Sequence, residues 1–277
     1  MNLDEFRQMY DFSGQTVIIS GGTGVLGGEM ACALVGMGAN VAMIDRNPNL
    51  ADPLKKRLGC GPGCATAVYA DVLDRESLMK AEEVVLAEFG PASILINAAG
   101  GNSPRATTGP DMSFFDIPTP NFQDILNLNS MGTILPCQVF GRGMAERGRG
   151  TILNISSMAA FRPLTRVVAY SAAKAAISNF TYWLAAYMAK EYNPNIRVNA
   201  IAPGFFIGNQ NRDLLIDAAS GELTERGKLI LEHTPMGRFG EPEDLLGTVL
   251  WLVSDASKFV TGIVVPVDGG FSAFPGV

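Results

Sequence analysis

Short apolar runs alternate with longer amphipathic segments along almost the whole chain. Strands are predicted near residues 16–20, 40–45, 65–70, 93–97, 150–156, 195–202 and 261–270. Helices are predicted near residues 29–37, 75–89, 121–147, 168–190 and 242–254. Strands separated by helices of roughly 10 to 15 residues are typical of an α/β fold with a doubly wound parallel sheet. We therefore expect about seven strands, helices on both faces and one domain over residues 1–277, since no repeat, linker or second core is visible.

Two long segments interrupt this alternation. Residues 101–120 contain four prolines and little periodicity, and a loop of this length inside a compact domain is usually functional. Residues 205–239 are irregular, with short helical pieces expected around 212–219 and 224–232. We expect the first segment to contribute to a substrate site and the second to form a movable lid over it.

Composition favours a well-packed protein without nucleic-acid or membrane partners. Hydrophobic residues make up 47% of the chain and charged residues 17%, and the formal charge is −6 without a basic block. The first residues lack the basic start and apolar run of a signal peptide. The apolar stretch 245–253 is about half as long as a membrane span and predicts a buried helix. A cytoplasmic protein is expected.

Cysteine and histidine spacing predicts neither a disulfide framework nor a metal site. The four cysteines, at positions 32, 60, 64 and 137, are expected to be free thiols. The close pair Cys60 and Cys64 in a glycine-rich turn is the only reservation. The single histidine, His233, has no metal-ligand spacing around it.

A glycine-rich turn follows the first predicted strand and opens the first predicted helix. Gly22, Gly24 and Gly27 fit the pattern G-x-G-x-x-G. Small residues let the backbone approach a pyrophosphate, and the helix start offers free N–H groups to it. A plain strand-to-helix turn is the alternative. The expected cofactor contacts in this turn are Gly21, Thr23, Gly24, Val25, Leu26 and Gly27.

Acidic residues follow the next two predicted strands. Asp45 comes about 20 residues after the glycines, where a dinucleotide fold places a carboxylate on the adenine ribose. This position favours NAD, because a carboxylate repels the extra phosphate of NADP. Arg46 could instead meet that phosphate, so NADP stays the less favoured alternative. Asp71, followed by Val72, is placed to cap a loop or to contact adenine.

Ser157, Tyr170 and Lys174 form the candidate catalytic group. Positions 170 and 174 lie one turn apart on a predicted helix, so a phenol and an ammonium share one face. A tyrosine titrates near ~10, and a nearby positive charge can lower its pKa toward the range of a working acid or base. Such a pair alone is only suggestive, but Ser157 at the end of the preceding strand strengthens it.

Asn129 lies inside the predicted helix 121–147, three residues before Gly132. Asparagine is a poor helix-interior residue, which predicts a local kink with Asn129 bonding backbone or water. An exposed asparagine on a regular helix is the alternative.

The order of these motifs resembles the short-chain dehydrogenase/reductase family over residues 12–277. Its most specific element is a serine followed 13 residues later by Tyr-x-x-x-Lys. The resemblance implies that Ser157 polarises the substrate oxygen, Tyr170 exchanges its proton, Lys174 lowers the pKa of Tyr170 and holds the nicotinamide ribose, and Asn129 anchors a water. It also implies a tetramer. Further cofactor contacts implied are Asn97, Ala98, Ala99, Gly100, Tyr170, Lys174, Pro203, Gly204 and Ile207.

Two positions depart from the family pattern. Val25 stands where the middle glycine of the turn is expected, which puts the pyrophosphate contacts in doubt. No threonine follows Pro203 and Gly204, so the nicotinamide carboxamide is expected to rely on backbone groups near Ile207 or on Asn209.

Several strings, among them AGGNSPRATT and APGFFIGNQNR, resemble the D-mannonate oxidoreductases of this family, also called fructuronate reductases. This resemblance implies a sugar acid as substrate and NAD as cofactor. A solvated surface charge is the alternative for each arginine taken singly. The expected substrate contacts are Asn102, Arg105, Ser157, Arg162, Asn211 and Arg212.

Other functions stay open at this point. A gluconate or neutral-polyol dehydrogenase would keep the chemistry and change the substrate. A nucleotide-binding regulator without catalysis is disfavoured, because it has no need of an acid-base tyrosine. Large apolar side chains after Lys174, including Phe180, Trp183, Leu184 and Tyr187, suggest a subunit contact, with intramolecular core as the alternative.

Overall fold

The computed structural model describes residues 1–50, 52–208, 212–218, 220–274 and 276. Its centre is a seven-stranded sheet in which every neighbouring pair is parallel, in the order β3-β2-β1-β4-β5-β6-β7. The strands are β1 (Thr16–Ser20), β2 (Asn40–Asp45), β3 (Cys64–Tyr69), β4 (Ile94–Asn97), β5 (Gly150–Ile155), β6 (Ile196–Pro203) and β7 (Val264–Val267). The predicted doubly wound Rossmann-type sheet is confirmed, with strand ends shifted by a few residues.

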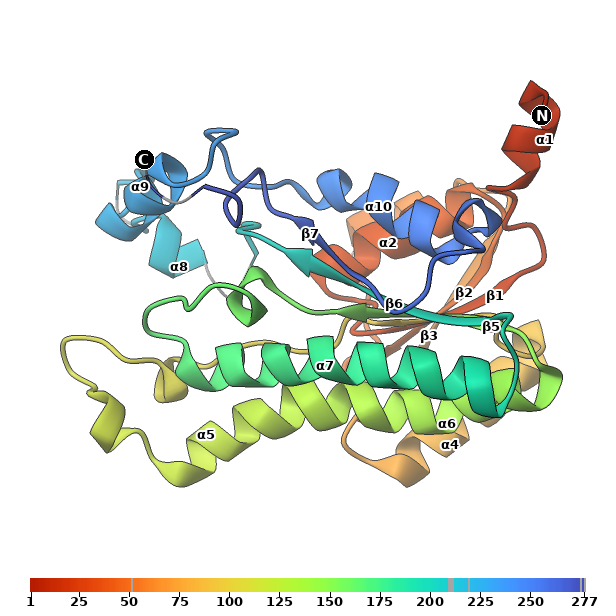
Figure 1. Ribbon diagram of the computed structural model, residues 1–277, viewed down its shortest axis with the longest axis horizontal. Helices are drawn as coiled ribbons and strands as arrows, with labels where there is room; N and C mark the ends of the chain where they lie inside the picture. Colours follow the sequence, from red (N-terminus) through yellow and green to blue (C-terminus); the bar gives the residue numbers. More distant parts are fainter. Residues whose placement is uncertain (51, 209–211, 219, 275, 277) are drawn as a thin grey trace.

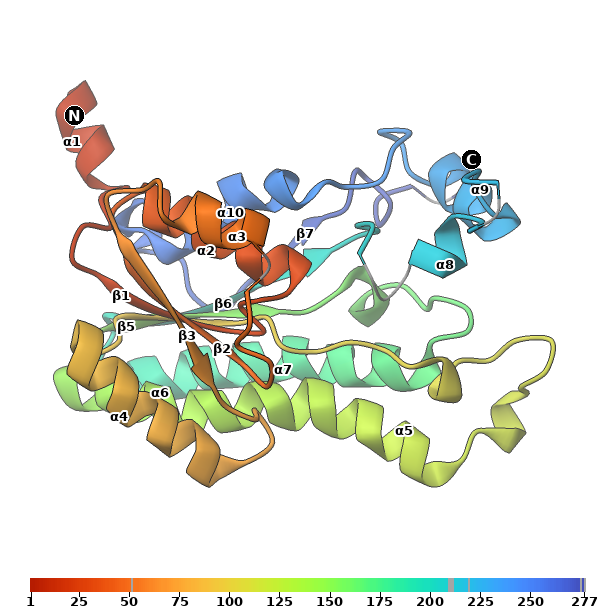
Figure 2. The ribbon, with the colours of Figure 1, turned by 180° about the vertical axis from the view of Figure 1, so that it is seen from behind.

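Helices cover both faces of this sheet (Figure 1), and Figure 2 shows the same layers from behind. One face carries α2 (Val25–Gly36), α3 (Asp52–Leu58) and α10 (Leu246–Val253). The other carries α4 (Arg75–Phe89), α6 (Gly132–Arg147) and α7 (Val168–Glu191). Each face has its own apolar core, so β1 and β6 are buried along their whole length.

The strand order reverses beside β1, which pairs with β2 on one side and β4 on the other. The chain leaves these two neighbours toward opposite faces of the sheet, which opens a crevice at the carboxyl ends of β1 and β4. The fold therefore places the glycine-rich turn after β1 and the segment after β4 at one mouth.

The predicted helix 121–147 is divided in the structure. It consists of α5 (Thr119–Leu126), a π-helical turn (Asn127–Met131) and α6. The predicted kink at Asn129 is confirmed, and the alternative of an exposed asparagine is wrong because its side chain is fully buried.

Two short helices carry no signal in the apolar pattern and were not predicted. α1 (Leu3–Gln8) buries no residue and is held by a capping box between Asn2 and Glu5. In α3 the only buried residue is Leu58, so no apolar stripe marks the helix.

Two irregular segments surround the crevice. The predicted loop after β4 holds the short 3-10 turns η1 (Pro104–Ala106) and η2 (Phe114–Asp116), and ends where α5 begins. The segment after β6 holds α8 (Arg212–Leu215) and α9 (Glu225–Glu232), close to the predicted helical pieces. Among the described residues, no helix combines the length and apolarity needed to cross a membrane.

Candidate active site

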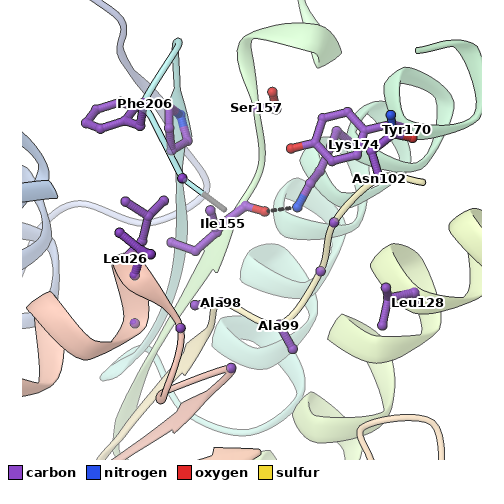
Figure 3. Close-up of a pocket in the computed structure, with 18 of the residues that line it drawn as sticks. Leu26, Ala98, Ala99, Asn102, Leu128, Ile155, Ser157, Tyr170, Lys174 and Phe206 are labelled. Atoms are coloured by element: carbon purple, nitrogen blue, oxygen red, sulfur yellow. Dashed lines mark hydrogen bonds between the residues drawn. The ribbon is translucent and has the colours of Figure 1, made fainter. Parts of the chain in front are cut away.

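A cavity of about 540 Å³ lies at the carboxyl ends of the strands, next to the point where the strand order reverses. Its walls come from the glycine-rich turn, the ends of β2, β4, β5 and β6, the first turns of α7, and α8 and α9. Figure 3 shows Ser157, Tyr170 and Lys174 gathered on one side of this cavity, across from Leu26. The cavity is long enough to join the glycine-rich turn to the tyrosine.

The glycine-rich turn is shaped by close backbone approach. Gly21 has a φ of 66°, and a Cβ there would lie 2.8 Å from the Cα atom of Ala99 at the end of β4. A Cβ on Gly27 would collide with the carbonyl oxygen of Gly21, so this glycine lets α2 pack against the turn. The N-cap of α2 is Gly24, and no side chain bonds to the first N–H groups of the helix. The turn can therefore offer backbone donors and a positive helix end to a pyrophosphate.

Val25, the departure from the family pattern, is compatible with this turn. It is the first residue of α2, its side chain is exposed, and it lines the cavity. The positive backbone angle that requires glycine is at Gly21. A side chain at position 25 therefore narrows the cavity without straining the turn.

Asp45 lines the cavity at the end of β2, and neighbouring groups fix its carboxylate. The hydroxyl of Thr23 donates to one oxygen at 2.7 Å, and the N–H of Asn47 donates to the other at 3.1 Å. Thr23, predicted as a cofactor contact, is not part of the cavity wall and instead orients the Asp45 carboxylate through this hydrogen bond. Arg46 is exposed and lines the same end. This donor and acceptor set fits the hydroxyls of an adenosine ribose.

The segment after β3 contributes Ala70 and Val72 to the cavity wall. Asp71 accepts a hydrogen bond from the N–H of Leu73 at 2.9 Å, so it caps this loop, one of its two predicted roles. Its side chain is not part of the cavity wall.

Some residues at the end of β4 line the cavity, and one stabilises the sheet behind it. Ala98, Ala99 and Gly100 line the cavity. Asn97 is buried instead, and its amide donates to Asn154 Oδ1 at 2.9 Å and to Cys137 Sγ at 3.1 Å. Asn97 therefore ties β4 to β5 rather than facing a ligand.

Asn129 holds the loop after β4 through the backbone of Gly101. Its Oδ1 accepts from the Gly101 N–H at 3.1 Å, and its Nδ2 donates to the Gly101 carbonyl at 2.8 Å and the Ile125 carbonyl at 2.9 Å. The π-helical turn widens the helix enough to free the Ile125 carbonyl for this contact. Both N–H groups of the amide and one acceptor site of its oxygen are used by the protein, so Asn129 positions the loop.

Ser157, Tyr170 and Lys174 all line the same end of the cavity. Ser157 follows β5, and the other two project from the first two turns of α7. The ammonium of Lys174 lies 5.4 Å from the ring centroid of Tyr170 and donates to the Ile155 carbonyl at 2.8 Å, the bond drawn in Figure 3. A half-buried phenol, a buried ammonium and a serine hydroxyl thus line one volume.

Burial is the main cause of the pKa shifts of Tyr170 and Lys174. The pKa of Tyr170 is raised above its ordinary value because burial disfavours the phenolate, and a hydrogen bond with Ser157 opposes that rise. The pKa of Lys174 is lowered to about 7, again by burial. These directions differ from the expected lowering of the Tyr170 pKa by Lys174. The physical reason is that the lysine is itself desolvated and keeps only part of its charge at neutral pH.

At the end of β6 the backbone turns back toward the cavity. Pro203, Gly204 and Ile207 line it, together with the buried ring of Phe206. A Cβ on Gly204 would lie 2.7 Å from the Cα atom of Asp268, so this turn packs on the C-terminal segment. Asn209, the other predicted carboxamide contact, lies outside the described residues.

Only some of the predicted substrate residues are part of the cavity wall. Asn102 lines the cavity, whereas Arg105 and Arg212 are exposed and are not part of its wall. The guanidinium of Arg162 donates to the Ser272 carbonyl at 2.9 and 3.1 Å, which ties its loop to the C-terminal segment instead of placing it in the cavity wall. Asn211 lies outside the described residues.

Sequence reasoning missed Arg226. It is the second residue of α9 and lines the cavity, half-buried, with its guanidinium bonded to Thr165. Nothing in the residue pattern separates it from the exposed Arg212, because both lie in the first turn of a short helix in an irregular segment. The apolar residues Leu214 and Leu215 of α8, which also line the cavity, were missed for the same reason.

Within the described residues, no group of three or more His, Cys, Asp or Glu side chains is placed to hold a metal ion. Cys32, Cys60, Cys64 and Cys137 are free thiols, and burial raises the pKa of the Cys137 thiol to about 12.

Known proteins share this sequence pattern and fold. A family model described as enoyl-(acyl carrier protein) reductase, of the short-chain dehydrogenase/reductase type, matches residues 24–272. The chain belongs to the short-chain dehydrogenase/reductase family. Like the relatives below, it is an oxidoreductase of that family.

Three similar proteins cover nearly the whole chain. An uncharacterized oxidoreductase of Bacillus subtilis, UxuB, is 48% identical over 96% of this chain and 98% of its own. A crystal structure of a candidate D-mannonate oxidoreductase from Haemophilus influenzae, with bound NAD, is 45% identical, has a TM-score of 0.89, and is matched over 96% of this chain and 98% of its own. A gluconate 5-dehydrogenase from Burkholderia cenocepacia, in complex with NADP and tartrate, is 28% identical, with a TM-score of 0.83 over 96% of this chain and 98% of its own.

Proposed function

We propose that this protein transfers a hydride between NAD(H) and a sugar acid, and that it interconverts D-mannonate and D-fructuronate. The observation that carries the proposal is a single cavity with the glycine-rich turn and Asp45 at one end and Ser157, Tyr170 and Lys174 at the other. One cavity can therefore hold a dinucleotide and bring its reactive end to an acid-base tyrosine.

NAD fits the residues at the first end better than NADP. The Asp45 carboxylate is held in the wall by Thr23 and Asn47, where it can accept from ribose hydroxyls and would repel a phosphate. Arg46, the residue that would favour NADP, is exposed and can point into solvent. The NAD bound by the Haemophilus influenzae relative supports the same choice. When bound, NAD accepts or returns the hydride.

The residues at the other end supply the proton chemistry. In the oxidation direction a deprotonated Tyr170 oxygen would take the proton of the substrate hydroxyl while the C–H hydrogen leaves as hydride to bound NAD⁺, and a C=O bond forms. Ser157, in the cavity wall with Tyr170, orients the substrate oxygen. The raised pKa keeps the Tyr170 phenol protonated, which suits a proton donor in the reduction direction.

Two observations support a sugar acid as substrate. The first is the name of the Haemophilus influenzae relative, at 45% identity over nearly the full chain. The second is Asn102, whose Nδ2 donates to Thr107 at 2.9 Å while its Oδ1 is buried without a partner. A buried acceptor without a donor is costly, and a substrate hydroxyl could satisfy it.

Gluconate is the second candidate. The Burkholderia cenocepacia relative is a gluconate 5-dehydrogenase with the same fold, and gluconate has the same carboxylate and carbon number as mannonate. The two acids differ in the configuration of one hydroxyl, so the choice depends on contacts such as that of Asn102.

The test is a spectrophotometric screen of the purified protein with NADH and, in parallel, NADPH. The carbonyl substrates are D-fructuronate, 5-keto-D-gluconate and neutral ketoses. We expect NADH oxidation with D-fructuronate at the highest kcat/KM. Preference for 5-keto-D-gluconate would favour the second candidate, and turnover restricted to neutral ketoses would refute a sugar acid altogether.

We also propose that the protein is a homo-oligomer, in line with the tetramer implied by the family resemblance. The outer face of α7 carries a stack of aromatic rings in which Trp183 and Tyr187 lie 4.8 Å apart between centroids. Trp183 is 57% exposed, and Tyr192 and Tyr182 are exposed beside it, which is an unusual amount of aromatic surface for a monomer. Light scattering should give a mass several times that of one chain.

A further inference from the structure

The end of the cavity near Tyr170 is bordered by three segments that are far apart in sequence and tied by hydrogen bonds. The N–H of Thr108, in the loop after β4, donates to the Arg166 carbonyl at 2.9 Å. Arg226 of α9 donates to the hydroxyl of Thr165 at 3.1 Å and to its carbonyl at 3.2 Å. Since α7 begins at Val168, this rim adjoins the helical turn that carries Tyr170.

Arg226 is the cation on this rim that can reach a substrate. The positively charged residues in the described cavity wall are Arg46, Lys174 and Arg226. Arg46 lies beside Asp45 at the opposite end, and Lys174 is bonded to the Ile155 carbonyl within the catalytic group. Arg226 is therefore the guanidinium at the substrate end, and its two bonds to Thr165 leave three of its five N–H groups for a carboxylate.

The described side chains leave the charge of Arg226 without an acidic partner. No carboxylate among the described residues forms an ion pair with Arg226 or Arg166. The pKa of Arg226 is lowered first by burial and then by the positive charge of Arg166. Two neighbouring guanidiniums without an acid favour an anion between or beside them.

The backbone of Arg166 adds a second unusual feature. Its φ of 77° is in the left-handed region, which non-glycine residues rarely adopt. Such conformations persist where surrounding bonds hold them and are often found at ligand sites. Here the Thr108 bond to the Arg166 carbonyl holds the backbone of the rim, and the charge of Arg166 is close enough to act on Arg226.

We infer that Arg226 binds the carboxylate of the substrate and, with the neighbouring charge of Arg166, makes the enzyme select sugar acids over neutral polyols. This inference rests on the proposed function and names the residue that sets its substrate class. A carboxylate bound to Arg226 would also link the substrate to the segment 205–239, because this side chain connects α9 to the loop that precedes α7.

The test compares Arg226→Gln, Arg226→Lys and the wild type in NAD-dependent oxidation of D-mannonate and D-mannitol. D-Mannitol carries a neutral CH₂OH group in place of the carboxylate and is followed as a competitive inhibitor if its turnover is too slow. Lys228→Gln is the matched control, because it removes one positive charge from the same helix at an exposed position outside the cavity wall.

We expect Arg226→Gln to lower kcat/KM for D-mannonate by roughly 10- to 150-fold, mainly through KM, with little change in the constants for D-mannitol. Arg226→Lys should lose less, because it keeps the charge but not the planar fork. Lys228→Gln should match the wild type. NADH binding, followed by fluorescence, shows whether each variant keeps its fold.

An unchanged preference for D-mannonate in a folded Arg226→Gln variant overturns the inference and leaves the proposed function intact. If that variant does not bind NADH, Arg226→Lys decides, and an unchanged preference there overturns the inference equally. A wild type that oxidises D-mannitol but no sugar acid overturns the proposed function and the inference together.

Discussion

The two ends of the cavity are built in different ways. The cofactor end consists of strand ends and glycine backbone, where a single added Cβ at position 21 would collide with the backbone after β4. The substrate end consists of loops and short helices from three regions, joined by a few hydrogen bonds such as that between Thr108 and Arg166. The cofactor end is therefore a rigid frame for the chemistry that the family shares. The substrate end is an adjustable rim whose residues can differ with the substrate.

The catalytic group lies where these two ends meet. Ser157 follows a central strand, and Tyr170 and Lys174 lie on a long helix packed against the sheet, so all three belong to the rigid frame. Burial shifts the pKa values of Tyr170 and Lys174, whereas the rim next to them selects the substrate. Each prediction below tests one side of this division.

The largest effect is expected at the junction, for Tyr170→Phe. This change removes only the phenolic oxygen, so turnover should fall by roughly 10³-fold with every substrate, while NADH affinity stays close to that of the wild type. Steady-state assays with D-fructuronate and a fluorescence titration with NADH measure the two quantities. Wild-type turnover in a variant that still binds NADH would exclude Tyr170 as the acid-base group.

Gly21→Ala tests the rigidity of the cofactor end. The added methyl group meets a positive φ and the Ala99 backbone together, so the free energy of unfolding should fall by about 3 kcal/mol and NADH binding should weaken. Gly36→Ala is the control, because this exposed residue of α2 has open space around it. Its free energy of unfolding should rise by about 0.5 kcal/mol. Urea unfolding measures both, and equal stabilities would contradict the account of the turn.

Asp45→Asn tests whether this end distinguishes the two cofactors. Loss of the charge should lower the preference for NADH over NADPH by roughly 30-fold, since the repulsion of the extra phosphate is removed. Thr23→Val keeps the charge and removes only the 2.7 Å bond to it, so its preference should change by a few-fold at most. The ratio of kcat/KM values with the two cofactors is the measurement, and an unchanged ratio in Asp45→Asn would assign the discrimination elsewhere.

Lys174 gives the smallest effect, a pH dependence of stability. Its folded-state pKa is about 7, below the ordinary value of 10.5, so between these pH values the unfolded chain holds a proton that the folded chain has lost. The free energy of unfolding should therefore rise with pH above 7, at about 1 kcal/mol per pH unit, whereas below pH 7 the full cost of the buried charge is present. Lys174→Met should remove this rise.

The measurement is urea unfolding of the wild type and Lys174→Met at pH 7, 8 and 9, and the difference between the two proteins isolates the lysine. A difference that is constant over this range would mean that the lysine keeps its charge after folding.

Much of the frame could be predicted from the sequence, because its signals are local. Asn129 illustrates this: an asparagine near a glycine inside a helix predicts a kink bonded to backbone, and the structure has a π-helical turn in which Asn129 bonds to Gly101. The partner itself, 28 residues away, could not be predicted, because only the packing of the loop after β4 on α5 brings Gly101 there.

The sequence by itself determined the alternation of strands and helices, the glycine-rich turn, Asp45 at a strand end and the spacing of Ser157, Tyr170 and Lys174. These features depend on backbone period and on residues close in the chain. Only the tertiary structure decided that Arg162 binds the C-terminal segment, that Arg226 lines the cavity, and that burial lowers the pKa of Lys174. The physical reason is that a long charged side chain takes its partner, and a buried group its pKa, from neighbours that only the folded chain brings together.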